Sequence, residues 1–119
     1  MPPDNPDRLE RIDRLQKAIA SINQLLQLIQ AHGPAAPPGC WVARYQVRHP
    51  SKIYWYYKLQ SNDAIFSTAS GRPSKYQHLG KAGTVAHVES VMQVTRRGLI
   101  DELQRVMATL TECVVDVGF

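Results

Sequence analysis

The first third of the chain has apolar residues at helical spacing. Isoleucine and leucine recur at alternating intervals of three and four residues, which is typical of the seam of an amphipathic helix. We predict a helix over residues 8–32, preceded by a flexible N-terminus over residues 1–7 and followed by a stiff proline- and glycine-rich linker over residues 33–39. The seam consists of Ile12, Leu15, Ile19, Ile22, Leu26 and Ile29.

This seam allows two interpretations. The helix packs against its own chain, or it pairs with a second copy and gives a homodimer through a coiled coil or a bundle. The narrow isoleucine-rich seam favours pairing, whereas its length falls short of the roughly three to four heptads of a convincing coiled coil. The sequence leaves both interpretations open.

The middle of the chain alternates between apolar and polar residues, as strands do. Two such segments, Trp41–Val47 and Lys52–Leu59, flank His49-Pro50-Ser51, and we predict that these three residues form the turn. Residues 64–67 and 75–79 are shorter strand candidates. The pattern therefore predicts an antiparallel meander of three to four strands.

Helical spacing returns after Thr84, which is a good N-cap residue. Apolar residues mark one face of a helix from Val85 to about Glu112, although Thr95 and Gly98 interrupt it. The fold class that follows is α+β: an N-terminal helix, a three- to four-stranded antiparallel meander and a long C-terminal helix packed on the sheet. Residues 40–119 would form this basic β-meander with its helix.

The predicted turn decides which side chains share a face of the sheet. A three-residue turn over residues 49–51 sets the even-numbered residues of both strands on one side. We expect the odd-numbered side to be the apolar core face, containing Trp41, Ala43, Tyr45, Val47, Ile53, Trp55, Tyr57 and Leu59. We expect the even-numbered side to be exposed, containing Val42, Arg44, Gln46, Arg48, Lys52, Tyr54, Tyr56 and Lys58.

Positive charge is concentrated in the same segment. Residues 37–83 contain seven lysines and arginines and the single acid Asp63, and they hold all five tyrosines and both tryptophans. Cations interleaved with aromatic rings suit a polyanion with stackable bases, so we expect a nucleic acid, DNA or RNA, as the partner. The expected nucleic-acid-binding residues are Arg44, Arg48, Lys52, Tyr54, Tyr56, Lys58, Lys75 and Lys81.

The segment Lys75–Thr84 places a lysine between glycines, ahead of a helix. Backbone N–H groups in such a loop can contact a phosphate, although the spacing differs from that of a P-loop. We find no pattern of paired carboxylates or nucleophile elbow, and we expect no enzyme. The four histidines and two cysteines form no Cys-x-x-Cys or His-x-x-x-His pair, so we expect neither metal nor other cofactor.

The compartment follows from weaker signals. No apolar run approaches the roughly 20 residues that span a bilayer, and the N-terminus lacks the basic and apolar regions of a signal peptide. Two cysteines, Cys40 and Cys113, fit a reducing environment. We therefore expect a cytoplasmic protein that does not associate with membranes.

Two segments, Tyr54-Trp-Tyr-Tyr-Lys-Leu-Gln60 and the run from Lys75 to Thr84, resemble a pattern in small uncharacterised bacterial proteins, cyanobacterial ones especially. The resemblance covers residues 41–112 and implies no activity. The residues themselves favour a non-enzymatic nucleic-acid-binding protein, such as a regulator or an accessory factor of a nucleic-acid machine. The alternative is a helix-mediated protein–protein adaptor or assembly factor, in which the charge serves solubility.

Overall fold

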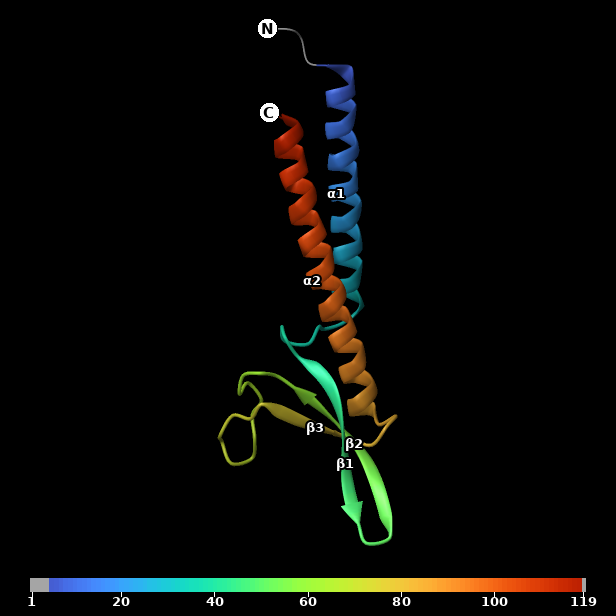
Figure 1. Ribbon diagram of the computed structural model, residues 1–119, viewed down its shortest axis with the longest axis vertical. Coiled ribbons are helices and arrows are strands. Elements are labelled where there is room, and N and C mark those ends of the chain that lie inside the picture. Colours follow the sequence, from blue (N-terminus) through green and yellow to red (C-terminus); the bar gives the residue numbers. More distant parts are fainter. Residues whose placement is uncertain (1–4, 119) are drawn as a thin grey trace. The chain divides into compact units, whose positions relative to one another are not determined.

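A computed structural model of the chain describes residues 5–118. The expected fold class is confirmed: helix α1 (Pro6–His32) is followed by strands β1 (Trp41–His49), β2 (Lys52–Gln60) and β3 (Tyr76–Gly80) and by the long helix α2 (Val85–Gly118). The strands form one antiparallel sheet in the order β1-β2-β3 (Figure 1). None of the helices in the described part of the chain is long and apolar enough to cross a membrane.

The chain divides into two compact units, and α2 contributes to both. One unit contains α1 and the turns of α2 from Gly98 onward, and the other contains residues 34–97, which include the linker, the sheet and the first turns of α2. Gly98 was expected to interrupt the second helix. The helix continues through it to Gly118, and the boundary between the two units falls at this glycine.

Helix α1 ends at His32 as predicted and begins at Pro6, two residues before the predicted start at residue 8. The Asn5 side chain accepts a hydrogen bond from the Asp7 N–H at 2.9 Å, Pro6 occupies the first turn, and Gly33 follows the last helical residue. Of the N-terminal segment expected to be flexible, residues 1–4 lie outside the described residues, whereas Asn5, Pro6 and Asp7 take part in this helix start.

In the helical unit, α1 and the C-terminal turns of α2 run antiparallel, side by side (Figure 1). Leu26 is buried and the other five seam residues are half-buried, so the apolar seam of α1 is covered in part within its own chain. The Arg8 side chain ties the two helices together, because its Nε donates to the Val117 carbonyl at 2.8 Å and its Nη2 donates to the Gly118 carbonyl. These bonds satisfy carbonyls that the end of α2 would leave without partners.

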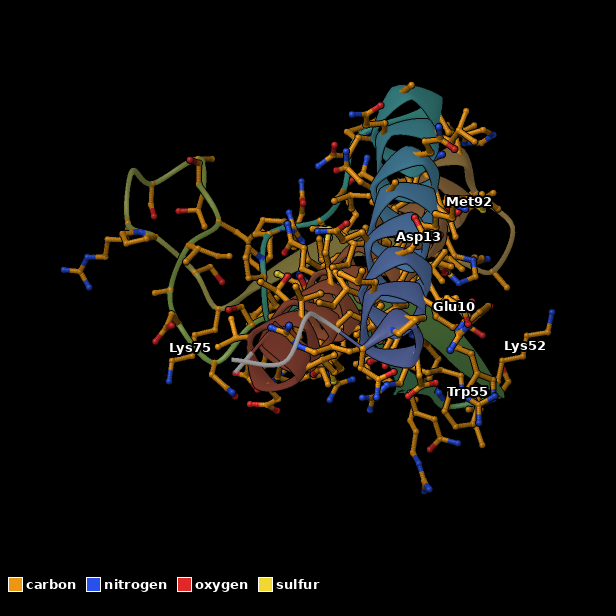
Figure 2. The ribbon with its side chains drawn as sticks, turned by 90° about the horizontal axis from the view of Figure 1, so that it is seen from above. Glu10, Asp13, Lys52, Trp55, Lys75 and Met92 are labelled. Carbon is orange, nitrogen blue, oxygen red and sulfur yellow. The ribbon has the colours of Figure 1, made fainter. Side chains whose placement is uncertain are left out.

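Acidic and basic side chains alternate by one helical turn on the exposed side of α1. Glu10 and Asp13 point outward from the helix (Figure 2), and each lies four residues before a cation. The Asp13–Lys17 pair has an N–O distance of 2.9 Å. Such exposed pairs contribute about 0.3–0.5 kcal/mol each to the stability of the helix.

The sheet unit has three strands because one candidate strand does not form. Residues 64–67 were expected to be a short strand, yet only Phe66 pairs, through two backbone hydrogen bonds with Ser74. The candidate at residues 75–79 is confirmed as β3, shifted by one residue. A bulge between Tyr57 and Lys58 of β2 interrupts its pairing with β3, so β3 accompanies only the second half of β2.

Candidate nucleic-acid interface

The turn between β1 and β2 has two residues, which corrects our prediction. His49 pairs with Lys52 across Pro50 and Ser51, so each residue of β1 lies opposite a residue of different parity on β2. No non-glycine residue of the described chain has a positive φ, which excludes the primed turns usual in such hairpins. Proline, with φ near −65°, suits the first central position of a type I turn instead.

This register redistributes the expected site residues. Residues directly opposite each other in an antiparallel pair point to the same side. Arg44 and Arg48 therefore share a side with Tyr57 and Ile53, and our grouping of these arginines with the lysines and tyrosines of β2 was wrong. Tyr45 of β1, which we had assigned to the core, shares a side with four residues of β2, namely Lys52, Tyr54, Tyr56 and Lys58, whereas Tyr57 of β2 lies on the other side. We call this side the tyrosine face; it consists of Tyr45, Lys52, Tyr54, Tyr56, Lys58, Tyr76 and His78.

The centre of the tyrosine face is a group of rings spread over all three strands. Tyr45 of β1 stacks on Tyr56 of β2, with ring centroids 5.9 Å apart. Its hydroxyl shares a hydrogen bond of 2.8 Å with His78 Nδ1 on β3, and the His78 ring meets Tyr76 edge-on at 5.3 Å. The rings therefore support one another, which limits the side-chain freedom that a ligand would otherwise have to restrict.

A lysine stands among these rings. Lys58 Nζ lies 5.3 Å from the centroid of Tyr45 and 5.0 Å from that of Tyr76. At such distances the ammonium group is attracted to the ring faces, which holds a positive charge over the aromatic surface. The arrangement offers a stacking surface and a phosphate partner side by side.

The tyrosine face continues toward the hairpin tip. Tyr54 meets His49 edge-on at 5.1 Å, and Lys81 Nζ lies 5.0 Å from the Tyr54 ring centroid. Lys52, the residue opposite His49, extends away from the hairpin (Figure 2). Three lysines are thus distributed from β3 to the tip, and two of them, Lys58 and Lys81, lie over aromatic rings.

The opposite side of the hairpin differs in character. The Arg44 guanidinium carbon lies 4.0 Å from the centroid of the Trp55 ring, and Trp55 is exposed at the outer part of the hairpin (Figure 2). Arg48 lies opposite the exposed Ile53. Nearer β3, this same side is the core of the unit, because Leu59 is 4% exposed.

The first turns of α2 cover this core side. The centroids of the His87 and Tyr57 rings lie 4.0 Å apart. A cavity of about 310 Å³ between the strands and the helix is lined by Leu59, Leu79, Ser90 and Gln93. The helix packs on the sheet here as expected. Because α2 occupies one side of the sheet, the tyrosine face is the side without a covering helix in this unit.

The glycine-containing loop before α2 is occupied by its own hydrogen bonds. The Gly83 N–H donates to His87 Nδ1 at 3.0 Å, and the Thr84 hydroxyl donates to the Leu79 carbonyl at 2.7 Å while accepting from the His87 N–H. The expected N-cap role of Thr84 is confirmed. Since these groups already have partners, the loop contributes Lys81 to the site, and the structure gives no support for a backbone phosphate cradle.

Lys75 lies apart from the rest of the expected set. It precedes β3, and its carbonyl accepts a hydrogen bond from the Ser61 N–H at 2.8 Å. Its side chain is exposed and extends from the far end of the sheet relative to Lys52 (Figure 2). Of the eight residues expected to bind nucleic acid, four belong to the tyrosine face, namely Lys52, Tyr54, Tyr56 and Lys58, and Lys81 reaches the Tyr54 ring from the loop before α2.

Two arginines of α2 fix the linker. Arg96 Nη1 donates to the Pro34 carbonyl at 2.9 Å, and Arg97 Nε donates to the Ala36 carbonyl at 2.7 Å. The Ala36 N–H in turn donates to the Gln93 carbonyl, and Ala36 is 1% exposed. Arg96 and Arg97 therefore act as structural anchors of the linker.

Sequence reasoning missed Tyr45, Tyr76 and His78 as members of the site. The first was assigned to the core by the wrong turn length, and the other two lie on β3, whose register the sequence does not specify. No family model, no curated protein and no solved structure matches this chain. The described residues contain no group of three metal-ligating side chains.

Proposed function

We propose that this protein binds nucleic acid, DNA or RNA, on the tyrosine face and catalyses no reaction there. Aromatic rings on a sheet surface can stack on bases, and lysines beside them can neutralise phosphates. A protein of this kind would serve as a regulator or an accessory factor of a nucleic-acid machine. The observation that carries the proposal is the register of the three strands, which brings four tyrosines, His78, Lys52 and Lys58 to one side of the sheet, with Lys81 beside Tyr54.

The layout favours a single strand as the ligand. Bases in a duplex are stacked on one another and do not present their faces, whereas unpaired bases can be splayed onto a sheet. The Tyr45 and Tyr56 rings form a continuous surface with Lys58 at its edge, which suits a base followed by its phosphate. Stacking contributes about 1–3 kcal/mol per base, so two bases give measurable affinity.

The three lysines set the expected salt dependence. Neutralising three phosphates of a single strand gives a slope of log K against log salt of about −2. Lys58 and Lys81 lie over the Tyr45 and Tyr54 rings, so charge and stacking should be lost together when the strand dissociates. Binding should weaken with salt without disappearing, because the stacking contribution is less sensitive to ions.

The test is fluorescence anisotropy of labelled single- and double-stranded oligonucleotides at low and physiological salt. Two double variants have the same change in charge on opposite sides of the hairpin: Lys58→Glu/Lys81→Glu on the tyrosine face and Arg44→Glu/Arg48→Glu on the other side. We expect the first to abolish binding of the single strand and the second to reduce it only through long-range electrostatics. Equal losses in both variants would mean that net charge, not the tyrosine face, determines binding.

A second candidate function has one specific observation in its favour. Leu25 and Leu28 on α1 are large apolar residues that are 46% and 68% exposed, as a protein-binding helix would present them. In this adaptor function the helices are the working surface and the sheet charge serves solubility. Charged substitutions at these leucines would then abolish function, and the Lys58→Glu/Lys81→Glu variant would retain it.

The proposed compartment is the cytoplasm. Cys40 and Cys113 are both free thiols and both half-buried. A reducing compartment preserves such thiols. Fluorescent tagging of the full chain in the native host tests this placement, since a secreted protein would leave the cell interior unlabelled.

A further inference from the structure

The first four turns of α2 expose an apolar stripe. Val85, Val88, Met92 and Leu99 are 73%, 50%, 41% and 48% exposed, although their spacing puts them on one side of the helix. Thr95 is the polar residue within the stripe, and its hydroxyl donates to the Val91 carbonyl at 2.8 Å. The threonine therefore has an internal partner, and the stripe has no charged member.

Val85, Val88 and Met92 of the stripe lie away from the side of α2 that packs within the unit of residues 34–97. The packed side of the same segment is occupied by Ser90, which is buried, by His87 against Tyr57, and by Arg97, whose side chain donates to the linker. The stripe residues lie on the other side of the helix. Neither the sheet nor the linker covers them.

The same face of α2 is covered farther along. Leu103, Val106 and Leu110 continue the stripe and are half-buried within the helical unit, where α1 lies beside them. One apolar helix face thus begins without a partner over residues 85–99 and then forms an intramolecular helix–helix interface. Continuity with that interface indicates that the uncovered part takes a helix as well.

The stripe is complementary to a reversed copy of itself. Its intervals of three, four, three and four residues are nearly symmetric about Met92. An antiparallel copy crossing at Met92 would oppose Val85 with the partner's Leu99, and Val88 with the partner's Thr95, in the alternating layers of paired helices. Met92 projects clear of the helix backbone (Figure 2), and a two-fold axis would set the two methionines side by side.

We infer that a second copy of this chain docks antiparallel on the α2 stripe over residues 85–99, giving a homodimer with a two-fold axis near Met92. The absence of charge in the stripe disfavours an acidic or a basic partner. Among the described residues no large side chain is fully buried, so dimerisation would add apolar burial that the chain itself lacks. The α1 seam, our expected dimer contact, is already used in part within the chain. This inference does not depend on nucleic-acid binding.

The test is the mass of the full chain by sedimentation velocity across a concentration series. We expect a dimer, and we expect Met92→Glu to raise the dimer dissociation constant by roughly 100-fold or more, because the axis sets two carboxylates together. The control Leu28→Glu introduces the same charge at an exposed leucine of α1 and should leave the constant unchanged. Circular dichroism confirms that both variants retain their helices.

A covalent measurement checks the geometry independently. Met92→Cys in a Cys40→Ser/Cys113→Ser background should form an interchain disulfide on mild oxidation, whereas Thr109→Cys, exposed on α2 outside the stripe, should not. A monomer at millimolar concentration would overturn the inference. So would a dimer dissociated by Leu28→Glu but not by Met92→Glu, since that result would place the interface on α1, and so would a stable complex with a different protein at the stripe.

Discussion

The two sides of the β1–β2 hairpin both combine cations with aromatic rings, but one side is an uncovered surface and the other packs in part against α2. On one side the cations are lysines, set among tyrosines that stack on one another and hydrogen-bond to His78. On the other side the cations are arginines, and the Arg44 guanidinium lies over the Trp55 ring. The part of this side around Leu59 is covered by α2. A sheet that is packed on one side can present a functional surface only on the other.

The difference between the sides depends on a single residue in the turn. A three-residue turn would have mixed arginines, lysines and tyrosines on one face, and the two-residue turn at Pro50 and Ser51 separates them. Because side chains alternate along a strand, one residue more or less in the connection moves a whole strand's set to the opposite side. Charge and aromatic content can be counted from the sequence, whereas their arrangement depends on the turn.

The largest effect expected is on the packed side. Leu59→Ala should lower the free energy of unfolding by about 2–4 kcal/mol, because Leu59 is buried under α2 and its truncation leaves a cavity. Urea denaturation followed by circular dichroism measures the change. Val47→Ala, at a half-buried residue on the other side, is the comparison and should cost clearly less. Similar losses would show that both sides of the sheet are packed.

Removing one ring from the tyrosine face should reduce binding and leave folding nearly intact. Tyr56→Ala should weaken single-stranded oligonucleotide binding by about 5- to 100-fold, the equivalent of one base-stacking contact. Tyr56→Phe keeps the ring and should retain most of the affinity. Isothermal titration calorimetry with Trp55→Ala, its neighbour on the other side, completes the comparison. The distinction between the sides fails if the tryptophan variant loses as much affinity as Tyr56→Ala.

The Thr84 hydroxyl at the start of α2 should contribute about 1 kcal/mol to the free energy of unfolding. Thr84→Val removes the cap of the His87 N–H and the bond to the Leu79 carbonyl with little change in shape. Thermal denaturation should show a lower midpoint. Thr109→Val is the matched control, because the Thr109 hydroxyl donates to the Arg105 carbonyl of its own helix, and it should leave the midpoint nearly unchanged. A stable Thr84→Val variant would contradict the assigned cap.

The smallest effect concerns the thiol near the start of β1. Burial raises the pKa of the Cys40 thiol, and a hydrogen bond with Ser61 partly opposes this shift. In a Cys113→Ser background, alkylation of Cys40 should be slow at neutral pH and should accelerate as pH rises toward the raised pKa, because the thiolate is the reactive form. Ser61→Ala should slow the reaction further. Rates that are fast and independent of pH would contradict the burial of Cys40.

Local signals in the sequence predicted the elements well. The glycine of the linker at Gly33 marks the end of α1, and Thr84 marks the start of α2, because caps and helix-breaking residues act within one turn, whereas the start of α1 at Pro6 lies within the segment that we had expected to be flexible. The strand at residues 64–67 was not formed, since an apolar alternation of four residues gives little to pair. The end of α2 was placed too early, because its last turns are stabilised by Arg8 from a distant part of the chain.

The candidate site was predictable in content and not in arrangement. The cluster of tyrosines and lysines in residues 41–81 is visible by eye, whereas Tyr76 and His78 join it only through the β2–β3 register. Arg96 and Arg97 look like surface cations in the sequence, and their carbonyl partners at Pro34 and Ala36 lie about sixty residues away. Long-range pairing of this kind leaves no local pattern.

The most direct measurement of the central claim is a nuclear magnetic resonance titration of the full chain with a short single-stranded oligonucleotide, following the aromatic ring signals. The account predicts that the rings of Tyr45, Tyr56 and Tyr76 shift together and saturate with the ligand, while Trp55 changes little. Shifts at Trp55 and on the helices, with the tyrosine rings unmoved, would contradict it and place binding elsewhere on the molecule.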